Sequence, residues 1–331
     1  MTAAVPDSSP SAAARPIPSQ RWGVLEFCAL SLLVCTIAGS LGAWYWLLDL
    51  CSHFRCYYFG FAVLCLIGVW RRKQSTWKWC LAVVLIWNGS LIAPYLPTTT
   101  SEPTGQVTPI SIVSLNVHTK NQNKKAVVDY LRKQKPDLIV VMEIDVDWAV
   151  ALKELDDLYP HRLMNPRPDN FGIGLMSMWP LSRPRVMDFA DNDLPSIVAT
   201  IQHDSSPLQI IATHPLPPIG SSRAAERDQQ LRKVALFAKS STIPCLVAGD
   251  FNATPWSAAF HEFASVSGLK DSALGRGVQA SWNARAWFMR IPIDHVFVPQ
   301  EAIVVHRAIG PDVGSDHFPV EATIVIPRES Q

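Results

Sequence analysis

An aspartate and an asparagine, two residues apart, stand where a short apolar run ends. Cys245–Ala248 has the composition of a buried strand, and Gly249, Asp250 and Asn252 come after it. Side chains two residues apart leave an extended chain on the same side, so the carboxylate and the amide are expected to lie together. Such a pair can orient water and phosphate oxygens. The same residues also fit an Asx-rich turn that leads into a helix and has no chemical role.

Other polar side chains that could do chemistry come at or near the ends of further predicted strands, or just before one. They are Asn116, Glu143, His214, Asp294, Asp316 and His317. Strand ends of a sheet-based scaffold commonly converge on a single site. The sequence therefore predicts one polar site that is assembled from segments far apart along the chain.

Six short motifs occur in a fixed order. They are LNV (115–117), ME (142–143), TH (213–214), GDFN (249–252), IDHVFV (293–298) and GSDHFPV (314–320). This ordered set resembles the endonuclease/exonuclease/phosphatase superfamily, whose fold is that of deoxyribonuclease I, and it covers about residues 108–327. The resemblance implies an α/β fold of two packed mixed β-sheets flanked by helices, a four-layer sandwich. It also implies divalent-metal dependence and hydrolysis of phosphodiester or phosphomonoester bonds.

The resemblance assigns three residues to a metal. Glu143 matches the principal metal-binding carboxylate of the superfamily, and Asn116 would help to hold the ligands of that metal. Asp316 would reach the metal directly or through water. Mg²⁺ is the expected cofactor, with Mn²⁺ as its substitute, because hard cations prefer oxygen ligands and retain several waters.

The remaining residues are assigned to catalysis by the same resemblance. Asp250 would orient or deprotonate the attacking water, and Asn252 would bind a phosphate oxygen. His317 matches the histidine that contacts the scissile phosphate, and Asp294 the carboxylate that fixes its tautomer and favours its protonated form. His214 would stabilise the developing oxyanion or protonate the leaving group. Some relatives carry tyrosine at this position, so the division of labour between Asp250 and His214 stays open.

Several neighbours of these motifs are interpreted as structural or solvated rather than chemical. They are His118, Asn121, Asp145 and His295. Arg223 and Arg227 lie on the helix predicted after His214 and could reach a phosphate, but a solvated helix face is the favoured interpretation. Three aromatic residues in or near one candidate specificity loop could stack on bases, contact lipid or belong to the core. They are Trp282, Trp287 and Phe288.

The elements that must position the site alternate between strands and helices. Ile110–Val117 and Leu138–Met142 are predicted strands, and the helix between them begins after Asn121 or Asn123 and ends before Pro136. This order implies a crossover unit with both strands in one sheet. A second strand–helix–strand unit is predicted from residue 208 to 248. Short β-like runs between residues 162 and 203 predict an antiparallel portion. A helix over 147–157 and strands over 293–298, 302–306 and 318–326 complete the prediction.

Three apolar runs precede residue 97: Leu25–Leu48, Cys51–Trp70 and Trp77–Leu96. The first and third have the roughly 20 apolar residues that a membrane-spanning helix needs. The second is either a third span, with His53 and Arg55 at the interface, or a re-entrant segment. A cleaved signal peptide competes for the first run, but its length and the runs that follow favour an anchor.

The predicted organisation has four parts: a disordered tail (1–20), a membrane region of about three transmembrane helices (21–96), a linker (97–109) and a catalytic domain (110–327). Six lysines and arginines flank the runs on one side, and only Arg55 lies on the other. With three spans, this bias predicts that the N-terminus lies in the cytoplasm and everything after residue 97 outside it. The expected location is a bacterial inner membrane, with the catalytic domain on the periplasmic side. If the second run does not cross, that domain faces the cytoplasm.

Cysteine usage and charge restrict the function further. Six of the seven cysteines belong to the membrane region, so the catalytic domain has only Cys245 and holds neither an internal disulfide nor a thiolate metal cluster. Cys51 and Cys56 could pair in an oxidising compartment, but both are interpreted as small apolar residues. From residue 103 onward there are 22 basic and 24 acidic residues, a net charge of −2. This balance gives no support for tight non-specific binding of duplex DNA.

The favoured hypothesis is a membrane-anchored, metal-dependent phosphoesterase, and within it a nuclease-like phosphodiesterase. The alternative substrate is a phospholipid or inositol-phosphate headgroup, which membrane tethering and the absence of net basic charge favour. A hypothesis of another class is a non-catalytic binding module held at the membrane. The presence of Glu143, Asp250, Asn252 and His317 argues against it. The sequence indicates no protein partner.

Overall fold

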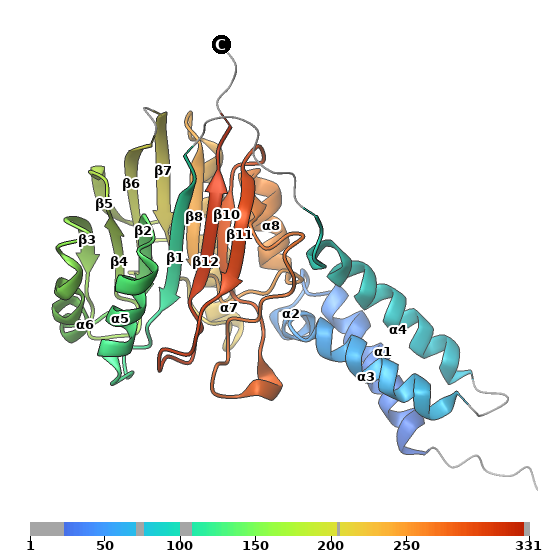
Figure 1. The fold of residues 1–331 in the computed structure, drawn as a ribbon. Coiled ribbons are helices and arrows are strands. Elements are labelled where there is room, and N and C mark those ends of the chain that lie inside the picture. The colour runs from blue at the N-terminus through green and yellow to red at the C-terminus, as the bar shows by residue number, and fades with distance from the viewer. Residues whose placement is uncertain (1–22, 71–75, 100–107, 204–205, 328–331) are drawn as a thin grey trace, which may run out of the picture.

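The computed structural model of the protein describes residues 23–70, 76–99, 108–203 and 206–327. These residues form a bundle of helices, up to Tyr95, and a β-sandwich that begins at Ile110 (Figure 1). The predicted tail (1–20) and most of the predicted linker lie outside the described residues. So do Arg71, Arg72 and Lys73, which contribute to the predicted orientation.

In the described part of the chain, two six-stranded sheets pack face to face, with strand orders β11-β12-β1-β2-β4-β3 and β5-β6-β7-β8-β10-β9. The first sheet consists of β1 (Ile110–Asn116), β2 (Leu138–Met142), β3 (His161–Asn165), β4 (Ile173–Ser177), β11 (Ile303–Ile309) and β12 (Val320–Val325). The second consists of β5 (Ser182–Asp188), β6 (Pro195–His203), β7 (Ser206–Ala212), β8 (Cys245–Asp250), β9 (Lys270–Asp271) and β10 (Asp294–Val298). The prediction of two packed mixed sheets is confirmed.

Each sheet contains one parallel pair of strands joined by a helix. The helix α5 (Lys124–Gln134) connects β1 to β2, and α7 (Ser221–Lys239) connects β7 to β8. Parallel neighbours require such a crossover, because a hairpin cannot join two strands that run the same way. Both predicted crossover units are therefore confirmed. Each brings the carboxyl ends of two strands to the same edge of its sheet.

Helices cover the outer face of each sheet. The side of α5 that carries Val127 and Leu131 packs on the first sheet together with Trp148 of α6 (Val146–Ala151). The helices α7 and α8 (Ala258–Ser267) pack on the second sheet. The helix predicted over 147–157 is shorter than expected: α6 ends at Ala151, and the 3₁₀ helix η2 (Leu152–Leu155) follows.

Side chains of the central strands alternate between two buried layers. In β1, Ile112 points into the core between the sheets, whereas Val113 and Leu115 pack under α5. Both faces are covered, so β1 is mostly apolar on both sides rather than alternately polar. This alternation decides which residues at a strand end enter the layer between the sheets.

Four helices and a 3₁₀ turn form the bundle that precedes the sandwich: α1 (Val24–Ser40), α2 (Trp46–Ser52), α3 (Arg55–Val69), α4 (Trp77–Ile92) and η1 (Ala93–Tyr95). Among the described residues, the continuous helix Trp77–Tyr95 is long and apolar enough to cross a membrane. The helices α2 and α3 meet the same measure together, but the chain bends by 60° between them. The helix α1 has 17 residues, fewer than the predicted first span. Cys51 and Cys56 are both free thiols.

Candidate active site

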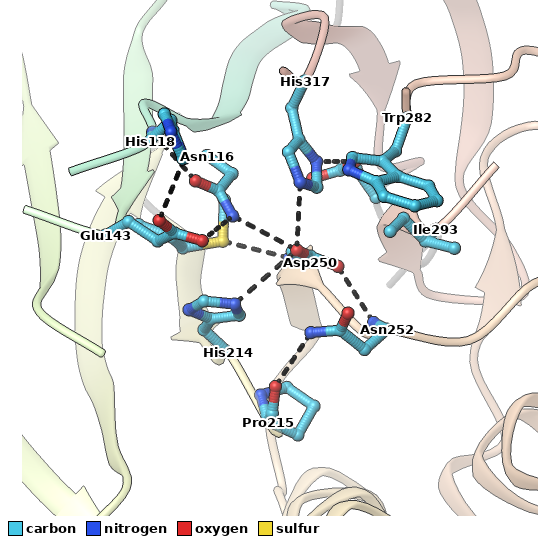
Figure 2. A network of polar contacts seen from close by, with 12 residues as sticks. Asn116, His118, Glu143, His214, Pro215, Asp250, Asn252, Trp282, Ile293 and His317 are labelled. Carbon is cyan, nitrogen blue, oxygen red and sulfur yellow. Dashed lines mark hydrogen bonds and ion pairs between the residues drawn. The ribbon is translucent and has the colours of Figure 1, made fainter. Parts of the chain in front are cut away.

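The eight residues predicted for the site gather at one end of the sandwich. Figure 2 labels six of them, and Asp294 and Asp316 join them through contacts with His317 and His118. Strand alternation explains three of them. Asn116 lies four residues after Ile112, Asp250 two after Ala248, and Asp294 two before Val296, and all three reference residues belong to the core between the sheets. These polar side chains therefore continue that core at its end.

Unusual backbone conformations direct other site residues. Glu143 follows a side chain of the inner core and has a φ of 60°, which turns its carboxylate back toward Asn116. Asn252 has a φ of 49°. Residues other than glycine adopt this left-handed region at a cost of about 1–3 kcal/mol, and such residues concentrate at functional sites.

Gly249 is required by close packing of two strands. Its φ is 154°, and a Cβ placed on it would lie 1.8 Å from the carbonyl oxygen of Thr213 on the neighbouring strand. The glycine of the GDFN motif therefore lets β8 approach the end of β7, and the next residue of each strand end, Asp250 and His214, can meet.

Asp250 lies at the centre of the network in Figure 2. Its Oδ2 accepts a hydrogen bond from Asn116 Nδ2 (3.2 Å), and its Oδ1 accepts one from the backbone N–H of Asn252 (2.9 Å). The same Oδ2 lies 3.6 Å from Nε2 of both His214 and His317. Burial, together with the charge of Asp294, raises the pKa of Asp250 to about 7, although His317 partly offsets this rise.

His317 and Asp294 form a buried ion pair. His317 Nδ1 and Asp294 Oδ2 are 2.8 Å apart. Burial alone would lower the pKa of His317, but the negative charges of Asp294 and Asp250 outweigh it and raise the pKa to about 10. Burial likewise opposes ionisation of Asp294, yet His317 overcomes it and holds the pKa of this carboxyl below its usual value. The pair is therefore an imidazolium and a carboxylate at neutral pH.

His214 differs from His317 in its charge. Its side chain is buried, burial lowers its pKa, and the ring packs beside Phe171 at a centroid distance of 5.5 Å. A lowered pKa makes it a neutral imidazole at pH 7, and its Nδ1 has no hydrogen-bond partner among the described residues. The two histidines on either side of Asp250 thus carry different charges.

Two carboxylates that are not fully buried converge at the mouth of the site. Glu143 is 13% exposed and Asp316 23%, and His118 Nδ1 lies 3.6 Å from the first and 3.3 Å from the second. Asn116 Nδ2 donates a hydrogen bond to Glu143 Oε1 (2.9 Å) and so fixes this carboxylate. Asn116 Oδ1 accepts a hydrogen bond from the backbone N–H of His118. Trp282 Nε1 donates to Asp316 Oδ2 (3.3 Å).

The residues at this mouth fit a hard divalent cation. Glu143 and Asp316 supply oxygen donors, and the buried Asp316 Oδ1 accepts no hydrogen bond among the described residues but faces His118 Nδ1 at 3.3 Å. Asp250, Asp294 and His317 also lie close enough to hold a metal ion. There, however, the protonated histidine already neutralises one carboxylate, and a cation would have to displace that proton. Glu143 and Asp316 lie nearer the surface and are the better-suited ligands, and a cation between them would take the place that His118 Nδ1 holds.

Sequence reasoning missed some of these contacts. His118, interpreted as structural or solvated, lies between Glu143 and Asp316, and its position two residues after Asn116 was the available signal. Arg227, interpreted as part of a solvated helix face, is 1% exposed; that interpretation is wrong. Its Nε contacts the adjacent Asp228 (2.8 Å), but its two guanidinium Nη atoms contact Asp49 and the Asn252 carbonyl, which are distant in sequence and could not be predicted from its own helix. Asn121 and Asp145 form local hydrogen bonds, as expected of structural residues.

Comparison with known proteins shows the family to which this sequence belongs. The sequence model of the Endonuclease/Exonuclease/phosphatase family matches residues 113–317, more than half of the chain. The chain belongs to this family. The name of the family describes hydrolysis of phosphoester bonds. A comparison with curated proteins finds no match.

Solved structures agree with the family assignment at the level of the fold. D. rerio TDP2 in complex with a single-strand DNA product superposes with a TM-score of 0.57 at 18% identity, covering 66% of this chain and 99% of the other. A Bacteroides thetaiotaomicron protein of the family gives 0.56 at 17%, covering 68% and 100%. Sphingomyelinase C from Streptomyces griseocarneus gives 0.52 at 16%, covering 65% and 99%.

Proposed function

We propose that the protein is a divalent-metal-dependent phosphodiesterase, anchored in a membrane, that cleaves P–O bonds by attack of water. The arrangement around Asp250 carries this proposal. A buried carboxylate with a pKa of about 7 lies 3.6 Å from a charged histidine and 3.6 Å from a neutral one. A base matched to neutral pH, beside a fixed positive charge, suits attack of water on a phosphodiester.

Asp250 takes the proton of the attacking water, and the new P–O bond forms as the bond to the leaving group breaks. Asn116 and the Asn252 N–H hold the Asp250 carboxylate during this transfer. His317 donates to a phosphate oxygen, where negative charge develops. Because His214 is neutral, its role is a hydrogen bond to a phosphate oxygen rather than transfer of a proton to the leaving group, which takes its proton from His317 or water.

A divalent cation completes the site in this proposal. Glu143 and Asp316 would hold it, and it would neutralise charge on the phosphate when bound. Asn116 supports Glu143, and Trp282 supports Asp316. Mg²⁺ is the expected ion and Mn²⁺ its substitute, because all of these ligands are oxygens.

A nucleic-acid phosphodiester is the favoured substrate. The D. rerio neighbour of the same fold carries a single-strand DNA product, which supports this choice. The net charge of −2 from residue 103 onward disfavours long duplexes and directs attention to single strands and short ends.

A phospholipid headgroup is the second candidate, and one surface feature favours it. Trp287, Phe288 and Met289 form the 3₁₀ helix η3 (Trp287–Met289) and are all exposed, Trp287 by 76%. The backbone of Arg290, just after them, accepts a hydrogen bond from Tyr57 of α3 (3.0 Å). In Figure 1 this orange loop projects from the end of the sandwich next to the helices. Exposed aromatic residues suit the interface of a bilayer.

Anchoring in a bacterial inner membrane, with the catalytic domain on the periplasmic side, is part of the same proposal. It is supported by large apolar side chains that point outward from α1, α3 and α4, among them Phe27, Leu64 and Ile86. Trp70 and Trp79, also exposed, lie near the ends of their helices, as interfacial aromatics do. A reporter fused at Gln331 tests the orientation, and activity of a cytoplasm-only reporter there contradicts it.

Hydrolysis by the full chain in lipid nanodiscs tests the function. With Mg²⁺, we expect cleavage of bis-(p-nitrophenyl) phosphate and of at least one of two natural substrates, a single-stranded oligonucleotide or phospholipid vesicles. A chelator should abolish the activity, and Asp250→Ala should lower it by about 10²-fold or more. Absence of hydrolysis, or equal rates for Asp250→Ala and the unaltered chain, refutes the proposal.

A further inference from the structure

The helical bundle contacts the sandwich at the segment that follows the catalytic aspartate. Asp49 of α2 accepts a hydrogen bond from the backbone N–H of Ala258 (2.8 Å), at the first turn of α8. His53 Nδ1 lies 2.9 Å from Thr254 Oγ1, and Trp256 Nε1 donates to the carbonyl of Leu91 (3.1 Å). In Figure 1, α2 lies between the other helices of the bundle and the sandwich, on the side that α7 borders. The segment 252–258 is thus held by residues from outside the sandwich.

A buried ion pair extends this contact into the site. Arg227 Nη2 lies 3.1 Å from Asp49 Oδ2, and the two residues are 1% and 3% exposed. Arg227 Nη1 also donates to the backbone carbonyl of Asn252 (3.0 Å). Asn252 in turn donates its own N–H to Asp250 Oδ1 (2.9 Å). Asp49 is therefore connected to the catalytic carboxylate through two intervening residues.

Asp49 is an unusual residue for this part of the sequence. Asp49 is the one acidic residue between Glu26 and Glu102, and it lies in an otherwise apolar helix. A charge in such a place is costly unless it is paired and hydrogen-bonded. Both oxygens of Asp49 have partners in the sandwich, one on α7 and one on α8. The pair also acts on a backbone that needs support, since Asn252 has a φ of 49°.

We propose that the helical bundle is a working part of the catalytic site, in which Asp49 and Arg227 are positioning residues for Asn252 and Asp250. The bundle is then more than an anchor: α2 determines where the carboxylate that accepts the water proton lies. The inference rests on the proposed hydrolytic function. His53 assists from the same side through Thr254.

Kinetics of the full chain in nanodiscs, with bis-(p-nitrophenyl) phosphate and Mg²⁺, test this inference. Asp49→Asn keeps the shape of the side chain and removes its charge. We expect kcat to fall by about 10- to 100-fold, because a small displacement of a catalytic group strongly lowers the rate of the chemical step, while KM stays within about threefold. Arg227→Gln should act similarly, and the double variant should be no worse than either single variant. Tyr57→Phe, which removes a different hydrogen bond of the same interface, is the matched control and should retain its kcat.

Each outcome decides a different question. If the unaltered chain does not hydrolyse the diester, the proposed function fails and the inference fails with it. If it does, and Asp49→Asn lowers the unfolding temperature but leaves kcat unchanged, the ion pair is structural only and the inference alone is overturned. If Asp49→Asn does not fold, Thr254→Val replaces it, since this variant removes the hydroxyl that contacts His53 Nδ1 (2.9 Å), keeps only the longer contact from the backbone N–H (3.4 Å) and leaves no charge buried. A kcat several-fold lower supports the inference, and an unchanged kcat overturns it.

Discussion

Replacing Asp294 with asparagine removes the charge that keeps His317 protonated. The two side chains are buried and 2.8 Å apart, so solvent screens the carboxylate charge only weakly. A hydrogen bond to a charged group contributes about 1.5–3 kcal/mol. If protonated His317 stabilises the negative charge on the phosphate in the transition state, losing this charged hydrogen bond lowers kcat/KM by about 10- to 150-fold.

The pH dependence gives a sharper test than the rate alone. In the unaltered protein His317 keeps its proton until the pH approaches its pKa of about 10, so activity should decline only at strongly alkaline pH. Without Asp294, only Asp250 and Asp316 oppose the lowering of the His317 pKa by burial, so the alkaline decline should move to lower pH. The stability changes in the same direction: the raised pKa of His317 stabilises the fold fully below pH 6.5, and this effect is lost as the pH rises through about 10. The lowered pKa of Asp294 acts at the other end of the range, and its contribution is lost as the pH falls below 3.8.

The assay is a pH–rate profile with bis-(p-nitrophenyl) phosphate from pH 6 to 10.5, together with thermal unfolding at each pH. Asp271→Asn is the matched control, because Asp271 is also a buried carboxylate beside a buried histidine, with 3.5 Å between Asp271 Oδ2 and His295 Nδ1. The control should lower stability without moving the alkaline limb. An Asp294→Asn profile with the limb and rate of the unaltered protein refutes the assigned role of the pair.

Three further predictions concern the remaining parts of the site. Glu143→Gln should raise the Mg²⁺ concentration for half-maximal activity by about 10- to 100-fold, as measured by metal titration of the rate; an unchanged titration curve places the cation elsewhere. Gly249→Ala should destabilise the fold by more than about 3 kcal/mol in denaturant unfolding, because its Cβ would lie 1.8 Å from the Thr213 carbonyl oxygen. Trp287→Ser combined with Phe288→Ser should abolish cleavage of phospholipid in vesicles and spare bis-(p-nitrophenyl) phosphate; equal loss on both substrates contradicts a lipid-contacting role.

The order of strands and helices in a mixed α/β domain could be predicted from local patterns in the chain, whereas the two packed sheets were implied by the family resemblance of the motif set. The run before Glu143 and the run before Asp250 have the apolar continuity of strands buried on both faces, and the helices between paired strands show helical spacing. Alternation of side chains along a strand then places Asn116, Asp250 and Asp294 on one side. These features depend on residues close in sequence, which is why the strands and helices could be predicted without the resemblance.

Chemical roles depended on more than local pattern. The order of the six motifs suggested which residues act together, and the structure brings them to one end of the sandwich. The charge states of the two histidines could not be read from the sequence, because they depend on which carboxylates lie nearby and how deeply each ring is buried. His317 faces two carboxylates and is charged, whereas His214 is buried beside Phe171 and is neutral.

The sequence by itself determined the strand pattern, the motif set and the apolar character of the first part of the chain. Tertiary structure alone decided that Arg227 is buried against Asp49, 178 residues away, and that His118 lies between Glu143 and Asp316. The physical reason is the same in each case. A charged side chain is exposed or buried according to the partner that packing brings to it, and no local periodicity encodes a partner from another part of the chain.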